Sequence, residues 1–288
     1  MDRIAVIAPG AMGSGIAGVL ARGGAEVLTW LEGRSPATIA RAEAAGMRCA
    51  TVAEVAGADL ILSIVPPGQA LTLAAQLAQP LAASARKAVV VDCNALDVRT
   101  VQEVGRVIGA SGAAFVDGGI IGFPPAPGGA GGEGPSLYLS GEDAGRAGET
   151  LKRLGLKIRV IEGGVGAASA LKMSYAGITK GMTAVAALMA LGAARAGASE
   201  ALMAELRESQ PQLVVRFARS LPDMVPKAYR WVAEMREIAA FLGTDAAGGE
   251  VFEGIARLYE RLAADAAGDR AEVGALERFA AALPGPRA

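Results

Sequence analysis

Apolar positions along the first half of the chain follow two alternating patterns. Nearly continuous apolar runs, as expected of strands buried on both faces of a sheet, occupy residues 3–8, 26–30, 60–65 and 88–92. The windows between them, where apolar residues recur at helical spacing, are residues 12–23, 36–45, 69–83 and 97–110. This alternation predicts a doubly wound, mostly parallel β-sheet with helices on both faces.

The pattern changes after residue 110. Three more strands are predicted, at residues 114–117, 137–139 and 157–161. The glycine- and proline-rich segment Gly118–Pro135 is predicted to lack regular structure. After it, helical windows follow at residues 167–195, 199–219, 224–242, 249–265 and 271–282. We therefore predict an α/β domain over residues 1–162 and an all-α domain, beginning with a long helix, over residues 163–288.

The composition of the chain argues against a nucleic-acid or membrane partner and favours a reducing compartment. With 52% hydrophobic and 20% charged residues, the chain of 288 residues has enough apolar surface for a sizeable core. A formal net charge of −1 leaves no basic excess for a nucleic acid. The uncharged stretch 181–194 is shorter than the roughly 20 residues of a membrane span, so it is predicted to be a core helix and no membrane partner is expected. Only two cysteines, Cys49 and Cys93, favour a reducing cytoplasm.

The absence of histidine limits the available chemistry. With 0 histidines, the chain cannot build a Ser-His-Asp or Cys-His centre or a histidine zinc site. We predict no metal site. Proton transfer must therefore use a lysine, tyrosine, cysteine or carboxylate.

A glycine-rich turn follows the first predicted strand and precedes the first predicted helix. Its residues are Ala8, Pro9, Gly10, Ala11, Met12 and Gly13. The dinucleotide fingerprint G-x-G-x-x-G places its second and third glycines at Gly10 and Gly13, with Ala8 in place of the first. Gly10 would let the backbone approach a pyrophosphate, and Gly13 would let the helix pack closely on the sheet. The helix N-terminus would then face the phosphates, as in a Rossmann domain.

Residues after the second strand bear on cofactor choice. Glu32 lies 19 positions after Gly13, near the spacing of a carboxylate that binds the adenine ribose. Arg34 and Ser35 suit a 2′-phosphate through a guanidinium and a hydroxyl. These residues favour NADP over NAD. A second interpretation is that Ser35 and Pro36 only begin the next helix.

Taken together, this turn, the two-domain layout and the segment after residue 160 resemble the 6-phosphogluconate dehydrogenase-like superfamily. Within it, the chain is most similar to β-hydroxyacid dehydrogenases, in the subgroup with a phosphogluconate-dehydrogenase-like C-terminal domain. The family turn G-x-G-x-M-G corresponds to residues 8–13. The resemblance implies that Val65 and Pro66 lie beside the nicotinamide end of the cofactor. It also implies that Asn94, in place of the family's D-x-S-T hydroxyl, contacts the cofactor.

The family's substrate-binding stretch, D-x-P-V-S-G-G, corresponds to residues 117–123. The resemblance implies that Gly119, Ile121 and Gly122 line the substrate site. Ile121 replaces a serine that helps relatives to hold a substrate carboxylate. The implied substrate is therefore bulkier or less anionic than a small hydroxy acid.

The family's catalytic pattern, G-x-x-G-x-G-x-x-x-K, corresponds to residues 163–172 and ends at Lys172. On a helix of small apolar residues, desolvation would bring this lysine toward the range of a general acid/base. The alternative is a lysine whose stem packs on the helix and whose head reaches water. Tyr175 and Ala176 are further substrate candidates, Ala176 replacing the family's asparagine. Lys180 is a reserve candidate.

Together the motifs and the resemblance imply an NADP(H)-dependent oxidoreductase. A hydride would pass between the nicotinamide and an alcohol or carbonyl substrate bound between the domains, with Lys172 as acid/base. Imine reductases share the architecture, but they usually carry a different residue at the position of Lys172. A non-catalytic dinucleotide sensor is a third hypothesis. The resemblance also implies a homodimer formed through the helical domain.

Overall fold

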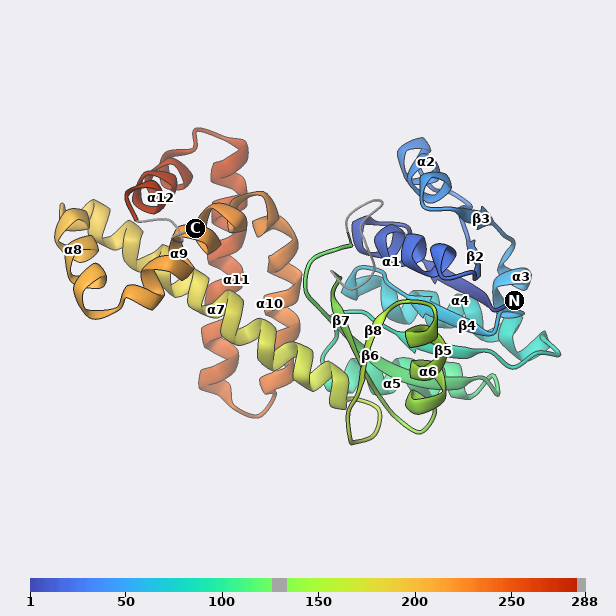
Figure 1. The fold of residues 1–288 in the computed structure, drawn as a ribbon. Helices are drawn as coiled ribbons and strands as arrows, with labels where there is room; N and C mark the ends of the chain where they lie inside the picture. The colour runs from blue at the N-terminus through green and yellow to red at the C-terminus, as the bar shows by residue number, and fades with distance from the viewer. Residues whose placement is uncertain (126–133, 284–288) are drawn as a thin grey trace. The chain divides into compact units, whose positions relative to one another are not determined.

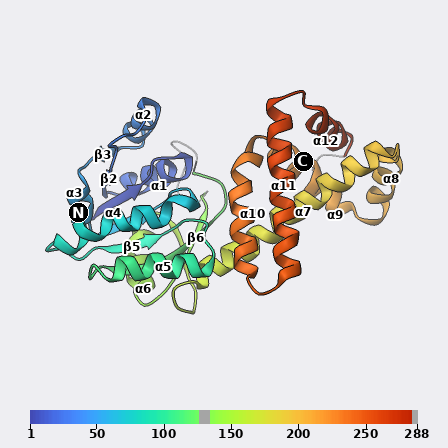
Figure 2. The same ribbon diagram turned by 180° about the vertical axis from the view of Figure 1, so that it is seen from behind.

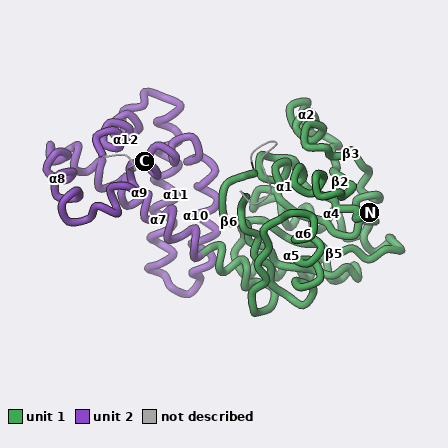
Figure 3. Tube along the Cα trace, viewed as in Figure 1, with its two compact units in different colours: residues 1–173 green, residues 174–288 purple. Residues whose placement is uncertain are grey.

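The computed structural model describes residues 1–125 and 134–283. The chain divides into two compact units, Met1–Met173 and Ser174–Ala288 (Figure 3). The division falls later than the boundary predicted at 162/163, because the first turns of the long helix that begins at Ala167 pack on the sheet of the first unit.

The first unit is built on one sheet of eight strands in the order β3-β2-β1-β4-β5-β6-β7-β8 (Figure 1). The strands are β1 (Arg3–Ile7), β2 (Glu26–Thr29), β3 (Met47–Cys49), β4 (Leu60–Ser63), β5 (Val89–Asp92), β6 (Ala114–Ile121), β7 (Ser136–Ser140) and β8 (Lys157–Val160). Neighbouring strands are parallel except β6 and β7, which are antiparallel. The strand order reverses direction at β1, between β2 and β4, where open α/β sheets bind ligands at their carboxyl edge.

Helices cover both faces of this sheet (Figures 1 and 2). They are α1 (Ala11–Arg22), α2 (Pro36–Ala44), α3 (Val52–Ala56), the 3₁₀ turn η1 (Pro67–Gln69), α4 (Ala70–Ala83), α5 (Val98–Gly109) and α6 (Ala144–Arg153). Alternate residues of β1 enter separate cores: Ile4 and Val6 pack with α1, α2 and α6, whereas Ala5 and Ile7 pack with α3, α4 and α5. The doubly wound sheet predicted from the apolar runs is thus confirmed.

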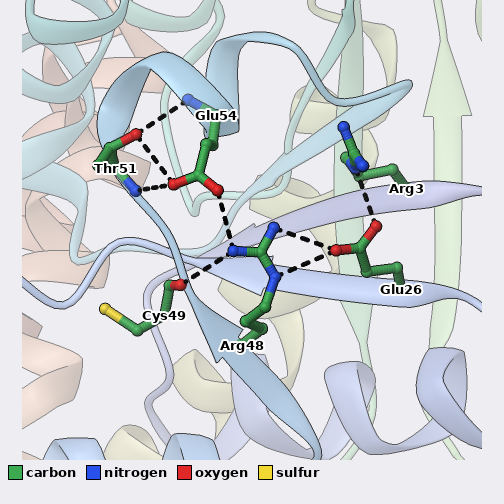
Figure 4. Close-up of polar contacts among 6 residues, drawn as sticks. All are labelled: Arg3, Glu26, Arg48, Cys49, Thr51 and Glu54. Atoms are coloured by element: carbon green, nitrogen blue, oxygen red, sulfur yellow. Dashed lines mark hydrogen bonds and ion pairs between the residues drawn. The ribbon is translucent and has the colours of Figure 1, made fainter.

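Three elements of this unit were not predicted, namely β3, α3 and α6. β3 and α3 are held by polar groups rather than by a long apolar pattern (Figure 4). Arg48 on β3 pairs with Glu26 on β2 at 3.0 Å and with Glu54 on α3 at 2.9 Å. Thr51 and Glu54 form a reciprocal capping box at the start of α3.

Part of the Gly118–Pro135 segment, predicted as irregular, is regular. β6 continues to Ile121, and Gly118 and Gly119 pair with Leu139 and Tyr138 of β7. The prediction was wrong here because glycine was taken as a strand breaker. In the structure, the absence of side chains lets other elements approach this strand closely. Residues 126–133 of the segment lie outside the described residues.

Within its described residues, 174–283, the second unit contains helices and no strands, as predicted. They are the later part of α7 (Ala167–Arg195), then α8 (Ser199–Ser209), α9 (Pro211–Met224), η2 (Val225–Lys227), α10 (Ala228–Leu242), α11 (Ala246–Ala267) and α12 (Ala271–Ala282). The single helix predicted at 199–219 is two helices, because Pro211 begins a new one. Tyr259 on α11 is fully buried, stacks edge-on to Trp231 at 5.3 Å, and donates a hydrogen bond to the Lys180 carbonyl at 2.6 Å.

α7 is, among the described residues, the one helix whose length and apolar composition would suffice to cross a membrane. Half of the residues in its most apolar window are buried inside the protein. That burial is typical of the core helix predicted from its uncharged stretch.

Candidate active site at the carboxyl edge of the sheet

The glycine turn after β1 has the geometry that the fingerprint predicts. A Cβ atom added at Gly13 would lie 2.0 Å from the Ala8 carbonyl oxygen, so only glycine lets α1 approach β1 this closely. A Cβ added at Gly10 would meet nothing within 4 Å. Gly10 and Ala11 are exposed, and Met12 is partly buried against the core. The turn therefore combines close helix packing with open space above Gly10.

The N-terminus of α1 is suited to an anion. None of the described side chains caps it, and Gly10, the N-cap residue, is extended. Its first N–H groups and the helix dipole thus face the space above Gly10. Arg41 of α2 donates a hydrogen bond of 2.9 Å to the Pro9 carbonyl and lines a groove of about 800 Å³ with Ala11 and Ser14. Sequence analysis missed Arg41, because no fingerprint position corresponds to it.

The residues after β2 have local hydrogen-bond partners. The Glu32 carboxylate accepts a hydrogen bond of 3.2 Å from the Trp30 indole. Ser35 is the N-cap of α2 and accepts a hydrogen bond from the Thr38 amide, as the helix-start interpretation predicted. Arg34 is exposed and forms no ion pair with any residue in the described ranges. Capping and anion binding are compatible, because both use the same helix end.

Asn94 differs from the expectation that its side chain contacts the cofactor. It is 3% exposed, and its amide oxygen accepts a hydrogen bond of 2.6 Å from the Val65 amide. Its amide nitrogen donates to Ser63 at 2.8 Å and to Asp92 at 2.7 Å. Asn94 therefore connects the end of β4 to the end of β5 through buried hydrogen bonds. Pro66, the next residue after Val65, is exposed at this edge.

Two buried acidic groups lie side by side in the sheet. Asp92 ends β5 and is in register with Asp117 on β6. Burial raises the pKa of Asp92 to about 7, and the Asp117 charge adds to this effect while hydrogen bonds from Asn94 oppose it. Burial also raises the pKa of the adjacent Cys93 thiol well above its usual value, so this cysteine is an inert packing group.

Lys172 lies against the end of β6. It is half-buried on α7, and its Nζ donates a hydrogen bond to the carbonyl of Ile120. Gly119 makes this contact possible, since an added Cβ would lie 2.8 Å from the Ala168 carbonyl oxygen and 3.3 Å from the Lys172 Cβ. Because β1, β4, β5 and β6 run parallel, their carboxyl ends share one edge of the sheet. The ammonium therefore lies on the edge that carries the glycine turn.

The N-terminus of α7 is held by two buried side chains that sequence analysis did not single out. Asp117 accepts hydrogen bonds from the Gly166 amide at 2.9 Å, the Ser169 amide at 3.0 Å and the Ser169 hydroxyl at 2.7 Å. Ser140 donates to Asp117 at 3.2 Å and accepts from the Ala168 amide at 3.0 Å. The sequence offered one signal, an aspartate in the family's D-x-P-V-S-G-G stretch.

The remaining substrate candidates differ in their accessibility. Ile121 is partly exposed at the end of β6, and Gly122 is exposed with a φ of +129°. Tyr175 is 50% exposed, whereas Ala176 is 3% exposed. The expectation that Ala176 touches a substrate is therefore not supported, because its methyl group is enclosed by the protein. Tyr175 and Ala176 belong to the second unit.

The first unit thus places, at one edge of the sheet, an anion-accepting helix end, open space over a glycine, and an ammonium. These groups fit a dinucleotide that carries phosphates and transfers hydride. Within residues 1–125 and 134–283, no three His, Cys, Asp or Glu side chains group in a way that could hold a metal ion.

Comparison with known families gives two matches along the chain. Residues 3–144 match the NAD binding domain of 6-phosphogluconate dehydrogenase, and residues 193–262 match a domain of unknown function, DUF1932. Among curated proteins there is no significant match.

Solved structures cover nearly the whole chain. A conserved protein of unknown function, described as structurally similar to 3-hydroxyacid dehydrogenases, is 28% identical (TM-score 0.69, 94% of this chain and 99% of that one). The Mycobacterium tuberculosis 3-hydroxyisobutyrate dehydrogenase, solved with L-serine, is 19% identical (TM-score 0.70, 96% and 99%). A Myxococcus stipitatus imine reductase variant with NAD+ is 21% identical (TM-score 0.59, 97% and 99%). The same species' imine reductase with NADP+ is 18% identical (TM-score 0.55, 97% and 99%).

The dehydrogenase and the two imine reductase structures are less than 25% identical to this chain, so they show a likeness of fold alone. The family matches are more specific, because they assign separate parts of the chain. This chain combines an NAD-binding domain of the 6-phosphogluconate dehydrogenase family with a C-terminal DUF1932 domain, and its fold matches that of a protein described as similar to 3-hydroxyacid dehydrogenases.

Proposed function

We propose that the chain is an NADP(H)-dependent oxidoreductase acting between an alcohol and a carbonyl, with Lys172 as general acid/base. The observation that carries this proposal is the position of the Lys172 ammonium, hydrogen-bonded to Ile120 at the same sheet edge as the glycine turn. Gly119 supports this position, because its lack of a side chain lets the first turns of α7 lie close to β6. The NAD-binding domain supplies the setting for a redox reaction.

The residues of the chain would bind the cofactor and the substrate, and Lys172 would transfer the proton. When bound, the nicotinamide cofactor supplies or accepts the hydride. In the reductive direction, the carbonyl carbon gains the hydride and its oxygen takes a proton from Lys172 Nζ, leaving a neutral amine that solvent reprotonates. In the oxidative direction, the neutral amine removes the hydroxyl proton. The Ile120 carbonyl holds the Nζ at this edge throughout.

For the cofactor, we propose that the first turn of α1 binds the pyrophosphate and that Arg34 and Arg41 favour NADP over NAD. Arg34 is exposed at the start of α2, and Arg41 is anchored to the turn through the Pro9 carbonyl. Arg34 precedes α2 and Arg41 lies in its last turn, and each guanidinium group would favour an additional phosphate placed beside it. Glu32, engaged by Trp30, would remain available for a ribose hydroxyl through its second oxygen.

The proposal is tested by turnover with a panel of alcohols, carbonyls and imines, each with NADPH/NADP+ and NADH/NAD+. Lys172→Ala should lower kcat for the accepted substrate about 10²–10⁴-fold, as expected for loss of a general acid/base. Lys152→Ala is the matched control, because Lys152 is an exposed lysine on α6. It should retain wild-type turnover.

Other outcomes would select a different function. Full activity of Lys172→Ala would contradict the assigned acid/base. Turnover of imines alone would identify an imine reductase. Tight binding of NADPH with no turnover of any substrate would favour a dinucleotide sensor.

We also propose that the protein works as a homodimer in a reducing, cytoplasmic compartment. Exposed apolar side chains along α7, namely Tyr175, Ile178, Val185 and Met189, support self-association. Both cysteines, exposed Cys49 and buried Cys93, are free thiols.

A further inference from the structure

Asp117 is a fully buried carboxylate with an unusually complete set of donors. It is 0% exposed, and it receives two backbone N–H groups and two hydroxyl groups, one hydroxyl from β7 and the other donors from the N-terminus of α7. Burying a carboxylate costs several kcal/mol unless hydrogen bonds replace its lost hydration. The N-terminus of α7 supplies part of that compensation through its dipole and its first amides.

Some helices of this protein, namely α2, α3, α5 and α11, have a side-chain cap at their own N-cap residue. An exposed side chain such as Ser35 or Thr51 caps its own helix from the N-cap position. α7 is instead capped from the neighbouring strands, by Asp117 on β6 and Ser140 on β7. The cap therefore fixes the position of α7 on the sheet, in addition to satisfying its amides.

The position of Lys172 depends on this cap. Ser169, whose amide and hydroxyl both bind Asp117, lies one helical turn before Lys172. The same strand then receives the ammonium at Ile120, three residues after Asp117. Between these two contacts, Gly119 leaves room for α7 to lie against the strand. β6 thus holds both the base of the lysine-bearing helix and the head of the lysine.

We propose that Asp117 is a positioning residue for Lys172. Its carboxylate fixes the first turn of α7 on β6 and so directs the Lys172 Nζ to the carboxyl edge of the sheet. This inference rests on the proposed function of Lys172 as acid/base. Ser140 supports the same geometry through its two hydrogen bonds.

The test is a double-mutant cycle in the full-length protein. Asp117→Asn keeps the shape of the side chain but turns an N–H group toward the α7 amides, and it should lower kcat about 10²-fold, as displacements of about 1 Å do. The KM for the cofactor should stay unchanged. In the Lys172→Ala background the same substitution should change the residual rate by no more than a factor of about 2, because two groups acting as a unit are not additive.

A matched control separates positioning from general loss of stability. Asp97 is a buried aspartate, 5% exposed, that caps α5 through the Arg99 and Thr100 amides. Asp97→Asn should have the same small effect in the wild-type and Lys172→Ala backgrounds. If Asp117→Asn does not fold, Ser140→Ala, which removes a single hydroxyl from the cap, should show a smaller, equally non-additive loss of kcat.

Hydrogen exchange gives a readout that does not depend on turnover. The amides of Gly166 and Ser169 should exchange faster in Asp117→Asn than in the wild type, whereas Asp97→Asn should leave them unchanged. Additive losses of kcat, or unchanged exchange at these amides, would overturn the positioning role. Full activity of Lys172→Ala would instead overturn the proposed function, with the exchange result still deciding whether Asp117 fixes the helix.

Discussion

At the scale of single residues, two glycines of one turn have separable tasks. Gly13→Ala would place a Cβ 2.0 Å from the Ala8 carbonyl oxygen, whereas Gly10→Ala would place one in open space. We expect Gly13→Ala to lower the free energy of unfolding by about 1–3 kcal/mol, as overpacking does. Gly10→Ala should change the free energy of unfolding by no more than about 0.5 kcal/mol. It should weaken NADPH binding about tenfold or more, because the added methyl group would fill the space proposed for the pyrophosphate.

Chemical denaturation and fluorescence titration of NADPH distinguish these effects in the same pair of variants. If both variants lost stability equally and bound NADPH like the wild type, the turn would be a structural feature without a nucleotide.

A second residue-scale prediction concerns Asp92. Its folded-state pKa is about 7, against 3.8 for an ordinary aspartate, so the folded state binds a proton that the unfolded state has lost. Below about pH 4 this proton makes its full contribution to the free energy of unfolding. The contribution decreases as the pH rises to about 7, and above that the free energy of unfolding no longer changes with the titration of Asp92. The difference is on the order of 4 kcal/mol.

No histidine titrates between pH 5 and 8 in this protein, because the chain has 0 histidines. Glu54 has a pKa lowered to about 2, chiefly by the Thr51 amide, so its contribution is lost only below pH 4.5. Unfolding free energies measured in urea from pH 5 to 8 should decline with pH in the wild type. They should be nearly flat in Asp92→Asn. The same slope in both proteins would contradict the titration of Asp92.

At the scale of elements, apolar periodicity predicted those that are long or buried on both faces. β1, β4 and β5 are continuous apolar runs, and α7 and α12 begin and end where the spacing places them. β3, α3 and α6 were missed. β3 has only three residues, and α3 depends on the capping box of Thr51 and Glu54, whose T-x-x-E signal is present in the sequence.

Some residues of the candidate site could likewise be predicted from the sequence, and others could not. Gly10, Gly13 and Lys172 could be proposed from the sequence, because the roles predicted for them depend on residue type and spacing along the chain. Arg41 and Asp117 were not, because the Arg41 partner lies 32 residues away and the Asp117 partners lie 23 to 52 residues away. Only the pairing of strands and helices brings those groups together. The hydrogen bonds of Asn94 to Val65 and Ser63, 29 and 31 residues away, were not predicted for the same reason.

At the scale of the whole molecule, the exposed side of α7 within the second unit bears on assembly. Tyr175, Ile178, Val185 and Met189 are 50%, 64%, 54% and 60% exposed. Their spacings of three, seven and four residues keep them on one side of the helix, as in a seam that packs against another helix. Water-exposed apolar side chains in such a row favour burial against an identical row on a second copy.

Val185→Glu should therefore convert a dimer to a monomer, because it would bury two unpaired carboxylates at the seam. The control is Val160→Glu, since Val160 on β8 of the first unit is 53% exposed, against 54% for Val185. Sedimentation equilibrium should give twice the chain mass for the wild type and Val160→Glu, and a single chain mass for Val185→Glu. Circular dichroism should show unchanged helix content in both variants, so that loss of the dimer is not loss of the fold. A wild type that sediments as a monomer, or a Val185→Glu variant that remains dimeric, would place the partner of this helix elsewhere.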